Sequence, residues 1–174
     1  MCSLLISGHS KRPPKISTIE KRYFEKVKRN KGGDYISKNG VVRLAKKIRK
    51  PCSDCKYNCS SRITESKRMQ LFREYYVLGD VHLQWQWIAR QIERTTPKDR
   101  RRNRLTTKQR QNVFHYNFII NGNKERVCKL FFLNTLAISN IDTAIKKCDE
   151  FGTLLQNDLR GYNRKTITNT DGNE

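Results

Sequence analysis

The chain has 174 residues, and 37 lysine and arginine residues against 16 aspartate and glutamate residues give it a formal net charge of +21. A protein this basic repels itself when it is compact, so the charge indicates a polyanionic partner, and nucleic acid is the partner that we expect first. Its share of hydrophobic residues, 36%, is enough for one core of about 100 residues and too little for two.

Membrane and secreted proteins are disfavoured by what the sequence lacks. No run approaches 18 consecutive apolar residues, so no transmembrane helix is expected. The first residues have no basic region before their short apolar stretch, so no signal peptide is expected. In the reducing interior of a cell the six cysteines should remain thiols. For a nucleic-acid-binding protein we expect the nucleus.

Apart from the short apolar stretch at its start, the chain is polar at both ends. We expect residues 1–40 to be a disordered basic N-terminal tail, within which a short helix from Thr18 to Lys28 is possible. Residues 156–174 are expected to be a disordered C-terminal tail. One domain, residues 41–155, remains between the tails. It opens with residues 41–50, whose pattern fits either a short strand or a basic nuclear-import signal.

Three cysteines lie close together near the start of this domain. Cys52 and Cys55 have the spacing that lets two thiolates bind one zinc ion, and Cys59 follows them. A closed site needs a fourth ligand, and we favour Cys128, because a strand-to-helix junction is expected there. The site should be structural, since no neighbouring His/Glu pair offers a general base. The alternatives are ordinary buried thiols, or a fourth ligand from among His115, Cys148 and His82.

Two amphipathic helices come after the cysteines. The first begins near Thr64, and the second begins after Gly79, which suits the position just past a helix, and Asp80, which can cap the next one. Their apolar residues recur at helical spacings and predict a helical hairpin. These residues are Met69, Phe72, Tyr75 and Tyr76 on the first helix and Val81, Trp85, Ile88 and Ile92 on the second.

Residues 94–112 have no apolar period, and they contain eight basic residues against one acid. We interpret them as a flexible basic loop inside the domain. Such a loop can follow a phosphate backbone and release counterions on binding, although a solvated linker would have the same composition. The residues that we assign to DNA contact here are Arg100, Arg101, Arg102, Arg104, Lys108 and Arg110.

A β-hairpin is predicted next, because aromatic and β-branched residues flank Asn121 and Gly122. After it, residues 129–136 predict a helix that leads through a turn at Ala137 into a second helix.

The second of these helices is expected to be the reading element of a helix-turn-helix. Ser139 would cap it, and Ile141, Ile145 and Cys148 would face inward. The outward face would present amide, hydroxyl and ammonium groups to base edges and phosphates. A plain helical pair that closes a core is the alternative. The outward residues are Asn140, Thr143, Lys146 and Lys147.

The predicted fold is therefore mostly α with a small β-hairpin. It combines the helical hairpin with the helix-turn-helix-like unit, is stabilised by zinc, and has flexible basic tails.

Several motifs resemble those of a known family. They are Cys52, Cys55 and Cys59 followed by Ser-Ser-Arg-Ile; Arg68, Phe72, Tyr76, Gly79 and Asp80; the run from Arg126 to Ser139; and Asp158 to Gly161. Over residues 35–165 the chain resembles the N-terminal region of uncharacterised, transposon-derived proteins of arthropods and cnidarians. In that family such a segment precedes a domain similar to a DDE-type transposase or integrase.

The resemblance implies a DNA-binding head without catalytic activity, and it implies that Cys128 belongs to the family pattern. The chain departs from that pattern in two places. Ala137 stands where the family more often has glycine, and the second helix is more often longer in the family. Both departures concern the part that would read bases.

We therefore expect a non-catalytic protein that binds nucleic acid, with duplex DNA favoured over RNA. The enzyme classes are disfavoured because the chain has only three histidines, no paired acids and no phosphate-cradling glycine-rich loop. Two alternatives remain open: an RNA-binding module of a ribonucleoprotein, and a protein-interaction module that binds polyanions without specificity.

Overall fold

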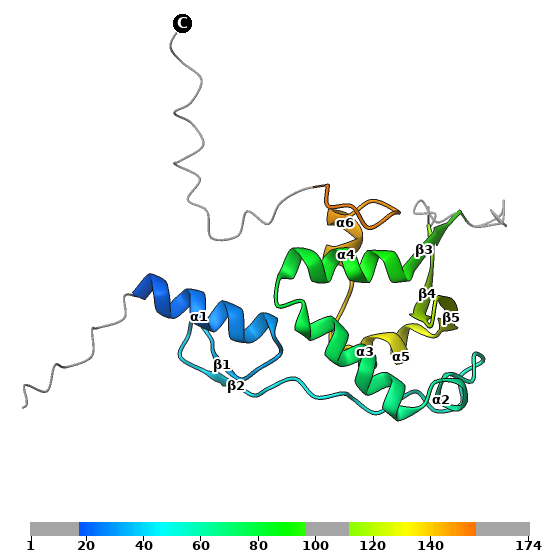
Figure 1. Ribbon diagram of the computed structural model, residues 1–174, viewed down its shortest axis with the longest axis horizontal. Coiled ribbons are helices and arrows are strands. Elements are labelled where there is room, and N and C mark those ends of the chain that lie inside the picture. Colours follow the sequence, from blue (N-terminus) through cyan, green and yellow to red (C-terminus); the bar gives the residue numbers. More distant parts are fainter. Residues whose placement is uncertain (1–17, 97–111, 156–174) are drawn as a thin grey trace, which may run out of the picture.

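The computed structural model describes residues 18–96 and 112–155 (Figure 1). Within these ranges no helix is both long enough and apolar enough to cross a membrane. The helices are α1 (Thr18–Asn30), α2 (Cys59–Arg62), α3 (Glu65–Val77), α4 (Val81–Gln91), α5 (Lys129–Thr135) and α6 (Asp142–Lys147). The strands are β1 (Tyr35–Ile36), β2 (Val42–Arg43), β3 (Ile92–Thr95), β4 (Val113–Ile120) and β5 (Asn123–Val127).

The strands make two antiparallel sheets within the described residues, so the fold is mixed rather than mostly α. β1 pairs with β2, and the second sheet has the order β3-β4-β5. The predicted β-hairpin is confirmed as β4 and β5. β3, which pairs with β4, is a third strand that the sequence did not predict. β3 continues directly from α4 and places Thr95 opposite Val113. Residues 94 and 95, which we had expected in the flexible loop, therefore belong to a strand.

The predicted helical hairpin is confirmed as α3 and α4. The Thr64 hydroxyl accepts a hydrogen bond from the backbone N–H of Lys67 at 3.4 Å, which caps α3. The Asp80 carboxylate accepts from the N–H groups of His82 and Leu83, which caps α4. Each cap satisfies donors that have no partner inside the first turn of a helix.

The core lies where the helical hairpin, the three-stranded sheet and α5 meet. The ring of Phe118 in β4 stacks on Phe132 of α5 with centroids 4.9 Å apart, and both side chains are fully buried. Leu71 of α3 and Ile88 of α4 are buried in the same cluster. The apolar stripes of the hairpin therefore cover one side of the sheet and α5.

The predicted first helix of the helix-turn-helix is confirmed as α5, but the segment after it differs from the prediction. Ala137 adopts a left-handed conformation (φ +50°), and α6 begins after Ile141, not after Ser139. α5 packs against α3 and β4, whereas α6 packs against α4 (Figure 1). Because the two short helices rest on different partners, the helix-turn-helix stays a prediction.

α1, β1 and β2 make up a small N-terminal unit, although we had expected most of it to be a disordered tail. Its link to the main body is made by backbone groups. The carbonyl of Asn30, at the end of α1, accepts a hydrogen bond from the Gln84 side chain of α4 at 2.7 Å. The carbonyl of Gly32 accepts one from the N–H of Lys46, in the segment after β2, at 2.7 Å. The end of α1 therefore docks on the helical hairpin, and the turn after it docks on the segment that follows β2.

Replacing Gly32 by alanine is expected to loosen this link. Gly32 has φ +73°, and a Cβ there would lie 2.7 Å from Cδ1 of Tyr76, whereas Gly40 (φ +75°) has no atom within 4 Å of that position. Gly40→Ala is therefore the control that measures only the backbone strain of an alanine in a left-handed conformation, about 1 kcal/mol. We expect Gly32→Ala to lower the free energy of unfolding in urea by about 2–4 kcal/mol, because overpacking is added. Equal losses would contradict the contact with Tyr76.

Candidate metal centre

Four cysteine sulfurs converge on one point of the structure. The Sγ atoms of Cys52, Cys55, Cys59 and Cys128 all lie within 4.8 Å of one another. The Sγ atom of Cys55 is 3.3 Å from that of Cys52 and 3.4 Å from that of Cys59. A tetrahedral ion with metal–sulfur bonds of about 2.3 Å has sulfur–sulfur edges of about 3.8 Å, so the four sulfurs can hold a metal ion. The ligand set is the one predicted, including Cys128.

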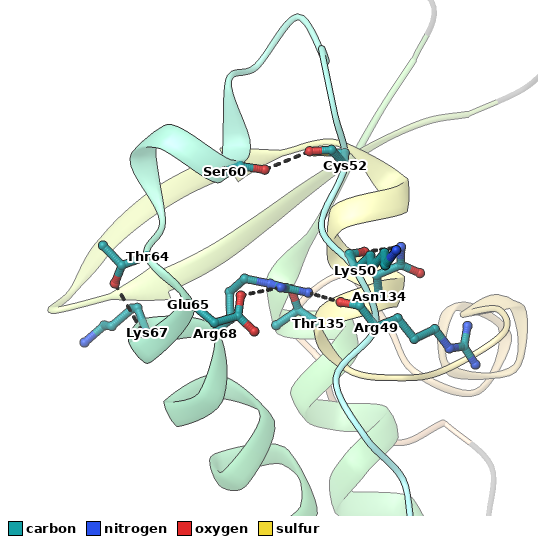
Figure 2. Close-up of polar contacts among 10 residues, drawn as sticks. All are labelled: Arg49, Lys50, Cys52, Ser60, Thr64, Glu65, Lys67, Arg68, Asn134 and Thr135. Carbon is teal, nitrogen blue, oxygen red and sulfur yellow. Dashed lines mark hydrogen bonds and ion pairs between the residues drawn. The ribbon is translucent and has the colours of Figure 1, made fainter.

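A tight loop brings the first three cysteines together. Asp54 (φ +41°) and Asn58 (φ +47°) both adopt left-handed conformations, which turn the chain sharply between the sulfurs. The N–H of Asn58 donates to the carbonyl of Cys55 at 2.9 Å. The Ser60 hydroxyl donates to the carbonyl of Cys52 at 2.8 Å, as Figure 2 shows, and closes the loop on itself.

The fourth cysteine is positioned by the junction between β5 and α5. Cys128 is the N-cap residue of α5, and its sulfur accepts a hydrogen bond from the N–H of Phe131 at 3.3 Å. Its own N–H donates to the sulfur of Cys59 at 3.3 Å. These two hydrogen bonds hold the sulfurs of Cys59 and Cys128 beside the start of α5.

Three of the thiols, those of Cys52, Cys55 and Cys59, differ in how readily they ionise. The backbone N–H of Cys59 stabilises the Cys55 thiolate and lowers the pKa of that thiol to about 6. Burial raises the pKa of Cys52 to about 11, and burial also raises the pKa of Cys59. Neighbouring thiolates repel one another, so a full set of four requires a cation among them.

An arginine joins the loop to the β-hairpin. Arg62 of α2 donates to the carbonyls of Tyr57 and Arg126, each at 3.2 Å, and it pairs with Glu125 of β5. The guanidinium of Arg126 lies over the Tyr57 ring, 5.2 Å from its centroid. These contacts connect the loop that carries three sulfurs to the strand that leads to the fourth.

A second arginine fixes the chain that enters the cluster. Arg68 of α3 is only 1% exposed, and it donates to the Arg49 carbonyl at 2.7 Å and to the Thr135 hydroxyl at 3.0 Å (Figure 2). It also pairs with Glu65 at 2.6 Å. Asn134 of α5 donates to the Lys50 carbonyl at 2.8 Å. Residues 49–50 are thereby held against α3 and α5 just before Cys52.

The other candidate ligands lie outside the cluster. His115 of β4 contacts Thr95 and Arg126 through its two ring nitrogens, at 3.0 and 2.5 Å. Cys148 is fully buried, at the end of α6, and His82 lies in the first turn of α4. Of the described residues, the four cysteines are the only group that could hold a metal ion.

The residues predicted to contact DNA fall into two sets. The first set lies at α6. Asn140, just before the helix, is exposed, as are Thr143 and Lys146 on the helix, whereas Lys147 is half-buried. The six basic residues of the loop, from Arg100 to Arg110, lie outside the described residues.

Arg94 lies in the segment that we predict to be a flexible loop, but in the structure it caps the C-terminal end of α6. Its guanidinium donates to the carbonyls of Ile145 and Cys148, at 2.5 and 2.9 Å. These carbonyls belong to the C-terminal end of α6, where a positive charge is favourable.

Comparison with protein-family models, with curated proteins and with solved structures found no match. The resemblance to transposon-derived proteins therefore stays a prediction.

Proposed function

We propose that the chain is a zinc-stabilised, non-catalytic protein that binds duplex DNA in the nucleus. It would use the exposed face of α6 together with the basic segment between β3 and β4. The proposal includes the family role suggested by the resemblance, the DNA-binding head of a transposon-derived protein.

Zinc is the metal that best fits four cysteine thiolates. Magnesium and calcium prefer oxygen ligands, whereas zinc prefers a tetrahedron of sulfur and nitrogen ligands. Four protein ligands leave no open position for a substrate, so the role of the ion is structural. Bound there, it would hold the loop of residues 52–59 against the start of α5.

The position of Arg94 is the observation that carries the DNA proposal. Thr95 and Val113 are paired, so the residues that flank the basic segment lie together at one end of the β3–β4 pair. Arg94 joins that end of β3 to the C-terminal end of α6. The segment that contains Arg100 to Arg110 therefore begins beside the helix that carries Thr143 and Lys146. Phosphate contacts from the segment and base contacts from the helix could then be made to one duplex.

The salt dependence of binding tests the contribution of the basic segment. Each phosphate contact adds about 0.9 to the slope of log K against log salt concentration. Replacing Arg100, Arg101, Arg102 and Arg104 by glutamine should reduce the slope for a labelled duplex by about 3.6, if each of the four contacts one phosphate. The matched control removes four exposed charges from other elements, through Lys56→Gln, Arg73→Gln, Lys124→Gln and Lys129→Gln.

A reduction of the slope in the first variant and not in the control is the expected result. Equal reductions would show that only net charge matters, as in the alternative of a non-specific polyanion binder. Single-stranded RNA is included as a competitor. Loss of the duplex complex at low RNA concentration would favour the ribonucleoprotein alternative and contradict the DNA proposal.

A further inference from the structure

α1 carries two adjacent aromatic residues that the other described residues leave more than half exposed. Tyr23 is 64% exposed and Phe24 is 53% exposed. Their rings contact each other edge to face, with centroids 6.2 Å apart. Single exposed apolar residues are common on protein surfaces. Two neighbouring exposed aromatic rings on one helix form a larger apolar patch than a single residue does.

The β1–β2 pair packs on a different side of α1. Glu25 accepts a hydrogen bond from the N–H of Ile36 at 2.5 Å, and it pairs with Lys28 at 3.1 Å. Residues two apart on an α-helix differ in direction by about 160°. Tyr23 therefore points away from the side of α1 that β1 covers, and Figure 1 shows α1 projecting from the main body.

Basic side chains flank the two rings, because Lys26 lies three residues after Tyr23 and Lys21 lies three residues before Phe24. Four exposed cations of α1 form no ion pair with any described residue, and they are Lys21, Arg22, Lys26 and Arg29. Glu20 and Glu25 are the only acids on the helix. A second copy of a chain with a charge of +21 would be repelled from this surface. Charge complementarity therefore points to an anionic occupant that also has flat apolar faces.

We propose that α1 binds single-stranded nucleic acid, with unpaired bases stacked on Tyr23 and Phe24 and phosphates paired with the surrounding cations. Stacking of bases on aromatic rings beside a basic track is the usual mode of single-strand binding. A duplex keeps its base faces covered by neighbouring bases, so the rings have no counterpart there. This surface is separate from α6, and the proposal goes beyond duplex binding by the chain.

The test uses the full-length protein and a labelled thymidine oligomer of about 20 nucleotides, with fluorescence anisotropy as the readout. The double variant Tyr23→Ala, Phe24→Ala should weaken binding of the oligomer by about tenfold or more, since stacking contributes strongly per base. The swapped variant Tyr23→Phe, Phe24→Tyr keeps both rings and should bind like the parent chain. Val77→Ala, at a residue that is 79% exposed on α3, controls for loss of surface apolar area.

Binding of a labelled duplex of the same length separates this proposal from the proposed function. The alanine variant should keep duplex affinity and the parent melting temperature, because both rings are exposed. Unchanged oligomer binding, or equal losses for oligomer and duplex, would overturn the proposal and leave duplex binding by α6 untouched. A glutamate- and leucine-rich peptide is the last probe. Binding of that peptide that depends on the two rings, without any effect on the oligomer, would assign α1 to a protein partner instead.

Discussion

If the four cysteines hold zinc as we propose, replacing Cys55 by serine is expected to release the ion and to destabilise the fold. Structural zinc contributes about 10–16 kcal/mol of apparent binding free energy in small zinc domains, and a serine hydroxyl is a poor substitute for a thiolate. Loss of one of four ligands should leave less than one zinc ion per chain after dialysis against a weak chelator. The expected drop in the free energy of unfolding is several kcal/mol. Metal analysis and thermal melting measure the two effects.

Cys148→Ser is the matched control for this experiment. Cys148 is fully buried but lies outside the cluster, so the same substitution should cost about 1–3 kcal/mol through the buried hydroxyl and leave the metal content unchanged. If Cys55→Ser retains one zinc ion per chain, or if both variants lose metal equally, the four-cysteine site is wrong.

Replacing Arg68 by methionine is expected to be the most damaging change outside the cluster. Arg68 satisfies the carbonyl of Arg49 and the hydroxyl of Thr135, and its guanidinium carbon lies 5.0 Å from the centroid of the Phe131 ring. Methionine fills a similar volume but leaves the polar partners without their donor, at about 1–3 kcal/mol each. We expect a loss of about 3–5 kcal/mol in the free energy of unfolding, measured in urea.

Three further variants locate the origin of that loss. Glu65→Gln removes only the exposed partner of Arg68, so it should cost less than about 1 kcal/mol. Thr135→Val removes the buried hydroxyl, and the double variant Arg68→Met, Thr135→Val should be less destabilised than the sum of the single variants. Additive losses would contradict the hydrogen bond between these two side chains.

The parts of the fold that the sequence predicts are those with local signals. The caps at Thr64 and Asp80 mark the starts of α3 and α4, and Asn121 and Gly122 mark the turn between β4 and β5. The spacing of Cys52, Cys55 and Cys59 predicts, in the same way, the loop that carries three of the four clustered sulfurs. Cys128 could be added to the predicted ligand set because a strand ends and a helix begins there. The signal for that junction also comes from residues close by in the sequence.

The parts that the sequence does not predict depend on distant partners. Ile92 continues the helical spacing of Ile88, yet it begins β3 because β4 lies beside it. In the sequence, likewise, nothing distinguishes ordinary surface cations from Arg49, Arg68 and Arg94. Each becomes a donor to backbone carbonyls of other segments only after folding. The predicted cap at Ser139 failed because the left-handed turn at Ala137 delays the start of α6.

The distance along the chain between Cys59 and Cys128, 69 residues, has a consequence for synthesis on the ribosome. At about 5–20 residues per second, the nascent chain carries three thiols without the fourth for about 3–14 s. A three-thiolate site leaves one position of the ion open, so metal exchange and oxidation are easiest in this interval. If the cluster holds zinc as we propose, the yield of correctly folded protein should therefore depend on the supply of zinc during translation more than on its supply afterwards.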